Sequence, residues 1–551
     1  MKKVFLVILA VSFGIVAGIY FSPLLSTDNI YQQIKKIDKV LNIAVKNYLE
    51  PVDTQKLGEA AVKGILSELD VHSVYISADE MKRVSEEFQG SFEGIGIEFD
   101  VINDTIVVVS PIPGGPSEAL GIRSGDKIVK IDGQNAIGMS RTDVPKKLRG
   151  PKGTIVEIDI KREGVKELLH FRIRRDKIPL NTIDAAFMVD GTDIGVIVVN
   201  RFAATTHDEL VNALEKLTKQ GMKKLVLDLR GNPGGYLNQA FLMAEEFIKS
   251  GDTIVYTKGR LPEFQEVYVS SGSSPYVKLP LIVLINAGSA SASEIVSGAI
   301  QDLDRGLVVG ETSFGKGLVQ RQYELGDGSA FRLTIAKYYT PSGRCIQRPY
   351  KDKDKYRHLV GRLELEEGSY IYDAYDKIVA QVKRINDTIK NPSDKISLDS
   401  LPIYYTRSKR VVFGGGGITP DYIIKSDTIT KMTASIRREN LFFEFLDKNY
   451  MSEIEKIKKT YPDFKDFYRK FIVSEQVLND FRSFVEKKGI KVEPSDWETD
   501  KEYISTYLKA QIARIIWTRE QFLEILFSVD NQFKKALELF PEAIKIAKLK
   551  N

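Results

Sequence analysis

The chain begins with an uncharged apolar stretch and continues with apolar residues at helical spacing. Residues 4–25 carry no charged side chain and are long enough to cross a hydrocarbon core of about 30 Å as a helix. Apolar residues then recur at helical intervals from Ile30 to Tyr48, and residues 57–69 repeat this pattern. The N-terminal part is therefore predicted to hold a segment of membrane-spanning length followed by two helices.

Short, branched apolar runs in the middle of the chain predict buried strands. They occupy residues 225–229, 281–285 and 307–309. After the second run, residues 295–303 return to helical spacing. The intervening residues 288–294 are therefore expected to lie where a strand turns into a helix.

Three serines, Ser289, Ser291 and Ser293, occur in that turn. The first N–H groups of a helix have no intrahelical partner, and the helix dipole favours negative charge beside them. Acyl transfer requires such an environment for its oxyanion. However, Ser291 and Glu294 also fit a capping box, in which the serine only caps the helix. These residues alone leave both interpretations open and do not choose among the three serines.

A lysine between two glycines favours the catalytic interpretation. Lys316 leads into residues 318–323, and if this segment is a strand, Lys316, Leu318 and Gln320 share one face. Burial lowers the pKa of a lysine, and the neutral amine can then accept a proton from a serine. Gln320 could hold that amine in place.

A histidine base is less attractive on sequence grounds. None of the four histidines lies in a glycine-rich turn or beside an acidic residue in a site-like setting: His72, His170, His207 and His358. Histidines distant in sequence can still meet a serine in space. We expect His72 to pack or form a hydrogen bond and His207 to face solvent.

The run at residues 225–229 leads into a glycine-rich turn that ends at Gly234 and Gly235. Glycines let backbone amides approach a ligand closely, so this turn could supply an oxyanion donor opposite the N–H of Ala292. Taken by itself, the segment is more simply explained as an ordinary loop after a strand.

Residues 228–235, 288–294 and 314–320 resemble, in order and spacing, the carboxyl-terminal processing proteases, a family of tail-specific serine peptidases. The resemblance implies a crotonase/ClpP-like mixed α/β protease core. Residues 337–344 and 414–421 are also similar to family segments. Residues 69–75 look like the family's Leu-Asp-Pro-His-Ser segment with Val71 in place of proline, which leaves only a local turn in doubt.

The resemblance also implies roles for individual residues. Ser291 would be the nucleophile, Lys316 the general base and Gln320 the residue that orients it. The oxyanion donors would be the amides of Ala292 and Gly235, with Gly234 a close alternative. No metal and no organic cofactor is implied.

A second resemblance, to PDZ domains, precedes the protease motifs. Residues 92–99 look like a carboxylate-binding loop and first strand, and residues 120–128 and 131–133 match later parts of that domain. Successive backbone amides can bind a terminal carboxylate while the peptide adds a strand to the sheet edge. The expected peptide-binding residues are Gly94, Ile95, Gly96 and Ile97.

These observations predict an α/β multidomain chain: a signal anchor or signal peptide (1–26), an N-terminal helical region (27–84), an inserted PDZ domain (85–176), a protease core (177–430) and a helical C-terminal extension (431–551). A charged, solvated insertion is expected at about 350–401. The extension shows no catalytic motif. Its helices are expected to pack as a core or to form a partner-binding or self-association surface.

Charge and cysteine content bear on location and partners. With Lys and Arg totalling 79 and Asp and Glu totalling 74, nothing favours nucleic acid. Cys345 is the single cysteine, so an intrachain disulfide is excluded. We expect Cys345 to have a packing role rather than a catalytic one. Lys2 and Lys3 precede the apolar stretch, so we expect an inner-membrane anchor with a periplasm-facing body, or a periplasmic protein if the segment is cleaved.

The functional expectation is a serine endopeptidase with a Ser-Lys dyad that recognises protein or peptide substrates by their free C-terminus. Two further partners are left open by the sequence, an adaptor protein and, in a homo-oligomer, other copies of the same chain. The alternatives are a PDZ scaffold or envelope adaptor with an inactive protease core and a crotonase-like acyl-CoA enzyme. Intact Ser291, Lys316 and Gln320 argue against the scaffold. An acyl-CoA enzyme would need neither a PDZ domain nor an export segment.

Overall fold

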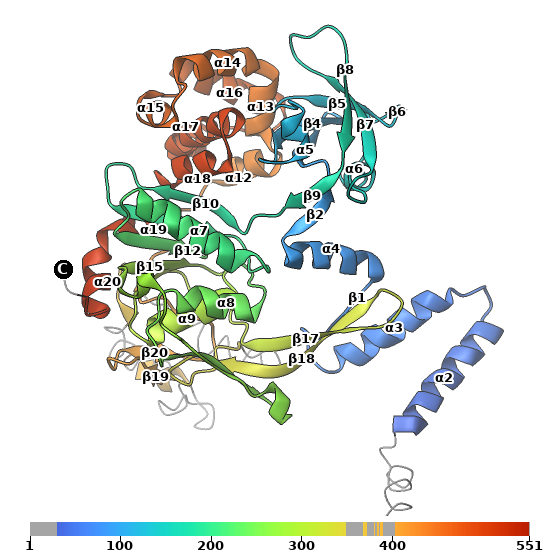
Figure 1. Ribbon diagram of the computed structural model, residues 1–551, viewed down its shortest axis with the longest axis vertical. Helices are drawn as coiled ribbons and strands as arrows, with labels where there is room; N and C mark the ends of the chain where they lie inside the picture. Colours follow the sequence, from blue (N-terminus) through green and yellow to red (C-terminus); the bar gives the residue numbers. More distant parts are fainter. Residues whose placement is uncertain are drawn as a thin grey trace, which may run out of the picture. The chain divides into compact units, whose positions relative to one another are not determined.

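The computed structural model describes residues 30–348, 367–371, 380, 383–384, 386–389 and 403–549 (Figure 1). The chain forms two compact units. One comprises Met1–Ala78 with Arg321–Thr334, and the other comprises Asp79–Gln320 with Ile335–Asn551. The predicted anchor at residues 4–25 and most of the predicted insertion at 350–401 lie outside the described residues.

The described part of the first unit contains the two predicted helices. They are α2 (Ile30–Asn47), which buries none of its side chains, and α3 (Thr54–Ser67). β1 (Val74–Ile76) pairs antiparallel with the first residues of β18 (Ala330–Tyr339). Among the helices described here and in the second unit, none combines the length and the apolar character needed to span a membrane.

The turn before β1 forms without the proline usual in the family. Asp70 Oδ1 accepts hydrogen bonds from the N–H groups of His72 (2.7 Å) and Ser73 (2.8 Å). Burial acts to raise the pKa of Asp70, but these hydrogen bonds outweigh it and the pKa is lowered. Val71 is 65% exposed. The aspartate, rather than the residue after it, therefore holds the turn.

The second unit begins with α4 (Ala78–Gln89), which leads into a small antiparallel sheet, the PDZ-like domain. Its strands, in the order β3-β4-β5-β7-β8, are β3 (Ile97–Ile102), β4 (Thr105–Pro111), β5 (Lys127–Ile131), β7 (Ile155–Lys161) and β8 (Leu169–Arg174), with β6 (Gln134–Asn135) paired to β5. Short helices α5 (Pro116–Ala119) and α6 (Val144–Leu148) accompany the sheet, and β2 (Ser91–Gly94) pairs with β9 (Asp176–Pro179). β3 is an edge strand and can therefore accept an added peptide strand.

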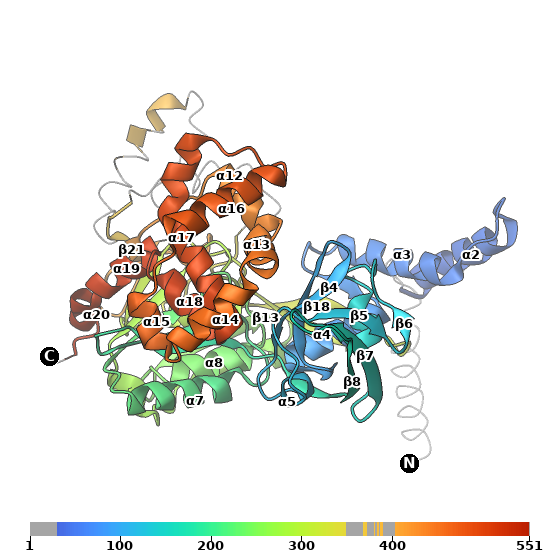
Figure 2. The same cartoon turned by 90° about the horizontal axis from the view of Figure 1, so that it is seen from above.

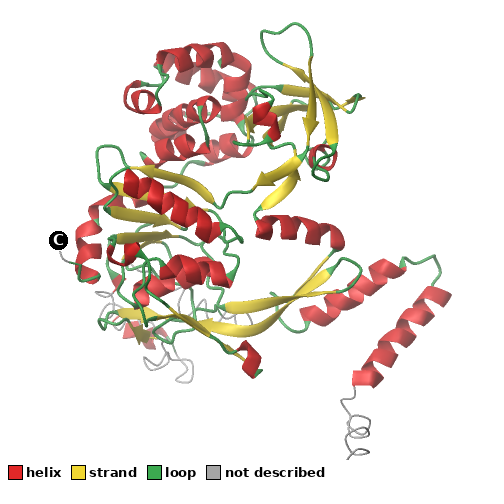
Figure 3. Cartoon of the chain, viewed as in Figure 1, coloured by secondary structure: helices red, strands yellow, loops and turns green. Residues whose placement is uncertain are grey.

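The central sheet of the second unit has six strands in the order β10-β11-β12-β15-β16-β21. Figure 3 draws the strands in yellow and the helices in red. The six strands are β10 (Ile183–Met188), β11 (Ile194–Val199), β12 (Lys224–Asp228), β15 (Leu281–Ile285), β16 (Leu307–Gly310) and β21 (Tyr422–Ile423). All neighbours are parallel except β10 and β11. The three predicted strands are β12, β15 and β16, and their continuous apolar sequence reflects burial on both faces.

Different helices cover the two faces of this sheet. On one face, α7 (Thr206–Lys219), α8 (Leu237–Glu245) and α9 (Ala292–Asp302) pack against residues such as Leu227 and Val283. On the other face, residues such as Val226 and Leu284 pack against α19 (Asn531–Glu538) and α20 (Phe540–Ile546). The last helices of the chain therefore complete the core around the sheet.

Shorter elements complete this unit. β13 (Thr253–Gly259) pairs with β14 (Val267–Val269) and with the last residues of β18, and β17 (Leu318–Glu324) also pairs with β18. The hairpin of β19 (Ile403–Tyr405) and β20 (Val411–Phe413) follows, and two 3₁₀ turns occur at Pro262–Phe264 and Pro275–Lys278.

Within the predicted solvated insertion, the described residues 367–368 are exposed, whereas Tyr370 and Ile371 pack on the core. Tyr370 forms an antiparallel bridge with Tyr422 of β21. Ile371 is fully buried. These residues extend the edge of the central sheet, so at this point the chain packs on the core instead of leaving it.

The helices of the extension before α19 form a bundle (Figure 2). Their buried side chains share one apolar core, which is rich in aromatic residues. These helices are α12 (Lys431–Arg438), α13 (Leu441–Asn449), α14 (Met451–Thr460), α15 (Phe464–Lys470), α16 (Glu475–Lys487) and α17 (Pro494–Ile516), followed by α18 (Arg519–Phe527). At the centre of the bundle the ring of Phe481 stacks on that of Phe442 and meets that of Phe445 edge to face. The core-packing interpretation of the extension is confirmed for these helices.

This bundle also contacts the PDZ-like domain. Ile102 and Val107, on the sheet face away from that domain's own core, form an apolar cluster with Phe443 of α13. Lys127 of β5 pairs with Asp447 at 3.3 Å. The extension therefore packs on the PDZ-like domain through α13 and on the central sheet through α19 and α20.

A cavity of about 260 Å³ lies between β10 and the extension, with Asp190, Tyr468 and Glu524 among its lining residues. Burial and the carboxylate of Glu520 raise the pKa of Glu524 from 4.5 to about 7. Between pH 4.5 and about pH 7, Glu524 is protonated in the folded chain and ionised in the unfolded chain. The free energy of unfolding therefore falls as the pH rises through this interval.

Glu524→Gln is therefore expected to raise the melting temperature at pH 8 and to leave it nearly unchanged at pH 4.5. The penalty removed at pH 8 is about 2 kcal/mol, because one pKa unit corresponds to about 1.4 kcal/mol and partial exposure weakens the effect. Thermal melts of both proteins at the two pH values measure the difference. An equal gain at both pH values would mean that Glu524 does not titrate in this interval.

Candidate functional site

Ser291 lies at the junction between β15 and α9 with a backbone conformation that is rare for a serine. Its φ is 54° and its ψ is −110°, and a non-glycine residue at positive φ carries strain that packing must compensate. Ser291 is partly exposed, whereas Ser289 and Ser293 are fully buried. The junction thus presents one of its three serines to solvent.

The two buried serines have structural partners. Ser289 Oγ donates to the carbonyl of Leu229 at 2.8 Å, and Ser293 Oγ donates to the carbonyl of Asn232 at 2.9 Å. Both bonds join the serine segment to the glycine-rich turn after β12. Ser289 and Ser293 therefore hold two loops together, which distinguishes them from Ser291.

Glu294 connects the serine segment to the lysine segment. Its Oε2 accepts from the N–H groups of Ser291 (2.8 Å) and Lys316 (2.9 Å), and its Oε1 accepts from Gly315 N–H (2.7 Å) and Ser313 Oγ (2.5 Å). Burial raises the pKa of Glu294, and the four donated bonds offset part of this rise. The carboxylate contact that defines a capping box is present, but the same carboxylate also fixes Lys316.

Tyr338 provides a second connection between these segments. Its hydroxyl oxygen lies 3.0 Å from the carbonyl oxygen of Ser291 and 2.6 Å from that of Lys316. Complete burial raises the pKa of this phenol well above its usual value, so the hydroxyl keeps its proton. Ser291 and Lys316 are therefore bridged through both their N–H and their carbonyl groups.

Lys316 and Gln320 meet as the sequence predicts. Lys316 Nζ donates to Gln320 Oε1 at 2.7 Å. β17 begins at Leu318, as the predicted strand at residues 318–323 does, and Lys316 lies in the loop before it. The Lys316 side chain is half-buried, and its amine still reaches the glutamine four residues on.

The glycine-rich turn approaches Ser291 from β12. A Cβ on Gly234 would lie 2.8 Å from the nitrogen of Ala292, and one on Gly235 would lie 1.9 Å from the carbonyl oxygen of Phe202. Gly234 N–H donates to Asn232 Oδ1 at 2.9 Å. Only glycine fits either position, and the amide of Gly234 is already engaged.

The other two candidate oxyanion donors are free of protein acceptors. Among the described residues, neither the N–H of Ala292 nor that of Gly235 donates to a backbone or side-chain acceptor. An unpaired N–H near the nucleophile can bind a developing oxyanion. The geometry therefore favours Gly235 over Gly234 as the second donor.

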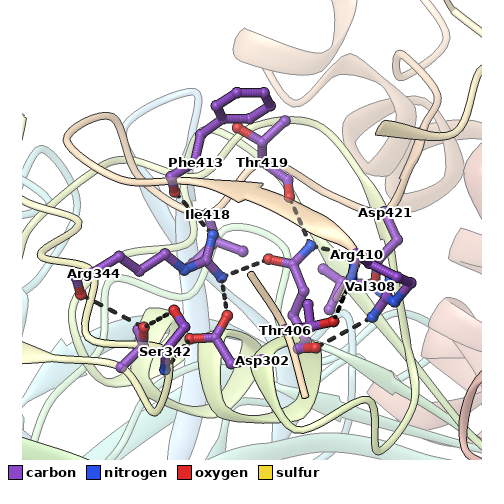
Figure 4. A network of polar contacts seen from close by, with 12 residues as sticks. Asp302, Val308, Ser342, Arg344, Thr406, Arg410, Phe413, Ile418, Thr419 and Asp421 are labelled. Atoms are coloured by element: carbon purple, nitrogen blue, oxygen red, sulfur yellow. Dashed lines mark hydrogen bonds and ion pairs between the residues drawn. The ribbon is translucent and has the colours of Figure 1, made fainter. Parts of the chain in front are cut away.

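A buried polar network holds the far end of α9 (Figure 4). Arg344 pairs with Asp302 at 2.7 Å and donates to Gln301 Oε1 at 2.6 Å and to the carbonyl of Phe413 at 2.8 Å. Gln301 in turn donates to Asp421 at 3.0 Å. α9 is thus fixed at its last turn by this network and at its first turn by Glu294.

Two histidines contact carboxylates, and for His207 this differs from the expectation that it faces solvent. His207 Nε2 lies 2.8 Å from Glu246 Oε1, so His207 does not simply face solvent. His170 Nδ1 lies 2.8 Å from Asp159 Oδ1 in the PDZ-like domain. No hydrogen bond between Ser291 and a histidine occurs within the described residues, and the base candidate beside the serine segment is Lys316.

The predicted carboxylate loop of the PDZ-like domain precedes β3. Gly96 has a φ of 75°, and the N–H groups of Ile95 and Gly96 donate to no acceptor among the described residues. Ile97 is half-buried at the sheet edge. Ile95 is 2% exposed and packs in the domain core, so its side chain is not available to contact a ligand.

Sequence reasoning missed Tyr338 and recognised Glu294 only as a capping residue. Glu294 forms its other bonds with residues that are distant in sequence. Tyr338 stands in a segment whose similarity to the family had been noted without a role for this residue. Glu294 belongs to a capping box, and a glycine-lysine-glycine turn follows it later in the sequence. The combination of these two motifs is the signal that could have drawn attention to Glu294.

Family models match four parts of the chain. Peptidase family S41 matches residues 193–354 and the PDZ domain matches residues 107–162. The N-terminal domain of the activating protease CtpB matches residues 24–80. A family of unknown function, DUF8443, matches residues 432–518 within the helical extension.

Curated relatives carry the same family name. The carboxy-terminal-processing protease of Bartonella bacilliformis is 39% identical over 346 residues, which cover 60% of this chain and 79% of the relative. The carboxy-terminal processing proteases CtpB and CtpA of Bacillus subtilis are 38% and 37% identical, each over 57% of this chain. This chain spans about two thirds of their lengths, 65% and 66%.

Solved structures include two similar chains at 31% identity. One is a photosystem II D1 C-terminal processing protease, which covers 56% of this chain and 83% of its own length with a TM-score of 0.32. The other is the PDZ domain of a carboxy-terminal protease from Vibrio cholerae in complex with a peptide, which covers 16% of this chain and 99% of its own length with a TM-score of 0.16.

The family models and relatives agree with the motifs at residues 228–235, 288–294 and 314–320. The predicted fold class, a mixed α/β core with an inserted PDZ domain and helical N- and C-terminal parts, is confirmed. With 39% identity across 79% of the Bartonella protein and with both the S41 and PDZ models matched, the chain belongs to the carboxy-terminal processing proteases of peptidase family S41.

Proposed function

We propose that this chain is a serine endopeptidase in which Ser291 is the nucleophile and Lys316 is the general base. The observation that carries the proposal is the double bridge between Ser291 and Lys316 by Glu294 and Tyr338. The bridge holds the backbones of the strained serine and of Lys316 together, and Gln320 Oε1 accepts a hydrogen bond from the lysine amine. Such a pairing is the requirement for activating a serine hydroxyl.

In the first half of the reaction, Ser291 Oγ attacks the carbonyl carbon of the scissile peptide bond and its proton passes to neutral Lys316 Nζ. The carbonyl oxygen becomes an oxyanion, which the N–H groups of Ala292 and Gly235 stabilise. When the intermediate collapses, the carbon–nitrogen bond breaks and the Lys316 ammonium gives its proton to the leaving amine. An acyl ester on Ser291 is left.

In the second half, a water molecule attacks this ester and passes a proton to Lys316, which is neutral again. A second oxyanion forms and collapses, and the proton returns from Lys316 to Ser291 Oγ as the acid product leaves. Gln320 accepts a hydrogen bond from the lysine amine throughout, so the amine stays directed at the serine. Protons balance over the cycle with no cofactor.

The PDZ-like domain is proposed to select substrates by their free C-terminus. The unpaired amides of Ile95 and Gly96 suit a terminal carboxylate, and the edge strand β3 suits an added peptide strand. The periplasm-facing location also remains a proposal and depends on residues 4–25. Engagement of an adaptor or a second copy is compatible with this arrangement.

Cleavage of a tailed protein tests the proposed function. The full chain, purified in detergent, is expected to cleave an unfolded protein that ends in a free apolar C-terminus and to cleave the C-terminally amidated form at least about 10-fold more slowly, because the amide loop loses its anion. Product masses over time measure both rates. Equal rates for the two forms would show that the domain does not read a carboxyl end.

Ile97→Asp is the matching variant in the binding edge. The added carboxylate repels the substrate's terminus and removes apolar contact, so cleavage of the tailed protein should slow more than cleavage of a short peptide. Ile155→Asp is the control, since Ile155 is on β7 of the same domain and is 42% exposed. If both variants slow the two substrates alike, the effect lies in folding and not in recognition.

A further inference from the structure

We propose that helix α19 of the C-terminal extension positions the oxyanion turn of the protease core, and that Asp530 and Gln532 do so by holding Arg230. The proposal rests on the proposed function, because it assigns a role in stabilising the oxyanion. Asp530 and Gln532 lie outside both the S41 match and the DUF8443 match. They are positioning residues and do not touch the reacting atoms.

Arg230 is the first residue of the turn that leads to Gly235, and its guanidinium is held from two sides. On the β12 side, Nη2 lies 2.6 Å from Asp228 Oδ2, and Nε is 3.0 Å from both carboxylate oxygens. On the α19 side, Nη1 pairs with Asp530 Oδ2 at 2.7 Å and donates to Gln532 Oε1 at 2.9 Å. The Phe527 ring lies 5.6 Å from the guanidinium carbon.

The turn between Arg230 and the free amide of Gly235 is short and is anchored by hydrogen bonds. Gly231 N–H donates to Asn286 Oδ1 at 2.8 Å, and Asn232 Nδ2 donates to the carbonyl of Val199 at 2.9 Å. Asn232 Oδ1 then accepts from Gly234 N–H. A displacement of Arg230 would be passed to Gly235 through only four residues.

Helix α19 is a firm support for this contact. Phe533 and Ala536 pack in the apolar core beneath the central sheet. Gln532 is 1% exposed, and its Nε2 donates to the carbonyl of Ile424 at 2.8 Å. Asp530 caps the helix, because its Oδ1 accepts from Phe533 N–H at 2.9 Å. The side chains that hold Arg230 are thus themselves fixed.

The charges allow a variant that weakens the contact without leaving a buried charge unpaired. Arg230 faces two carboxylates, Asp228 and Asp530, which raise its pKa although burial opposes this. In Asp530→Asn the pair of Arg230 and Asp228 remains, and asparagine still caps the helix. Gln532→Met removes the second acceptor at similar side-chain length. Replacing Arg230 itself would strand both carboxylates.

The test compares the double variant Asp530→Asn/Gln532→Met with wild type, both as full chain in detergent. A short peptide substrate gives kcat and KM, and a peptide boronic acid, whose adduct with a serine is a tetrahedral anion, reports on the oxyanion site. We expect kcat and boronate affinity to fall about 10- to 100-fold with KM unchanged, since misplacement by an ångström costs about that much. Glu538→Gln on the exposed side of α19 is the control and should stay within about two-fold.

Distinct outcomes separate this inference from the proposed function. If the double variant keeps kcat and boronate affinity within about two-fold of wild type, α19 has only a structural role and the inference is overturned. If the double variant does not fold, Asp530→Asn alone, which keeps the cap, decides with an expected loss of about 3- to 10-fold. If neither the wild type nor the Ser291→Ala variant cleaves any substrate, the proposed function itself is wrong.

Discussion

Replacing Ser291 by alanine is expected to lower the rate of peptide cleavage by at least about 10⁴-fold, because no other group in the site can form the acyl ester. The partly exposed Ser291 is followed by the free amide of Ala292. The fold should be retained, since the change deletes a single oxygen atom at a partly exposed position. Cleavage assays with the purified full chain, combined with a thermal melt, measure both effects.

Ser289→Ala and Ser293→Ala are the matched controls. Each removes a buried hydroxyl that donates to a carbonyl, that of Leu229 or of Asn232. Each should cost about 1 kcal/mol of stability and leave measurable turnover. A dead Ser293→Ala variant beside an active Ser291→Ala variant would reverse the assignment.

Replacing Lys316 has the second largest expected effect. Lys316→Ala should be inactive, and Lys316→Arg should lose at least about 10³-fold although it keeps the positive charge, because a guanidinium does not release its proton near neutral pH. Cleavage by the wild-type chain should rise with pH as the Lys316 amine loses its proton. Rates measured between pH 5 and pH 9 record this profile.

His207 provides the control for the base. It contacts Glu246, which is the arrangement that a serine–histidine mechanism would use. His207→Gln should leave the pH profile in place if Lys316 is the base. Loss of activity in that variant, with Lys316→Arg still active, would point to a histidine mechanism instead.

Much of the core could be predicted because its signals are local. The apolar runs that became β12, β15 and β16 are buried on both faces, and such strands appear in a sequence as continuous branched residues. The contact between Lys316 and Gln320 spans only four residues along one segment. The spacing of residues along the chain was therefore sufficient to predict these parts of the fold and of the site.

Long-range packing could not be predicted in the same way. Helices were predicted in the extension, but their sequence does not say which surface each helix covers. Only the structure shows that Phe533 lies against the central sheet and that Phe443 lies against the PDZ-like domain. The contact between Arg230 and Asp530 joins residues 300 positions apart, and neither residue type signals its partner.

Sequence motifs gave an incomplete account of residues that have two structural roles. Ile95 stands in the predicted carboxylate loop, yet its side chain fills the domain core, while its N–H donates to no acceptor among the described residues. Glu294 fits a capping box and also accepts from Lys316 N–H. A sequence motif assigns one role to each residue, whereas Ile95 and Glu294 each have two roles in the structure.

Trapping the acyl-enzyme tests the central claim most directly. A peptide p-nitrophenyl ester acylates a serine peptidase faster than water removes the acyl group, so the intermediate accumulates as a burst. The full chain is quenched in acid during turnover, digested and mapped by mass spectrometry. The account predicts a p-nitrophenol burst and an acyl group on Ser291. An acyl group on Ser289 or Ser293, or turnover without any burst or adduct, would contradict it.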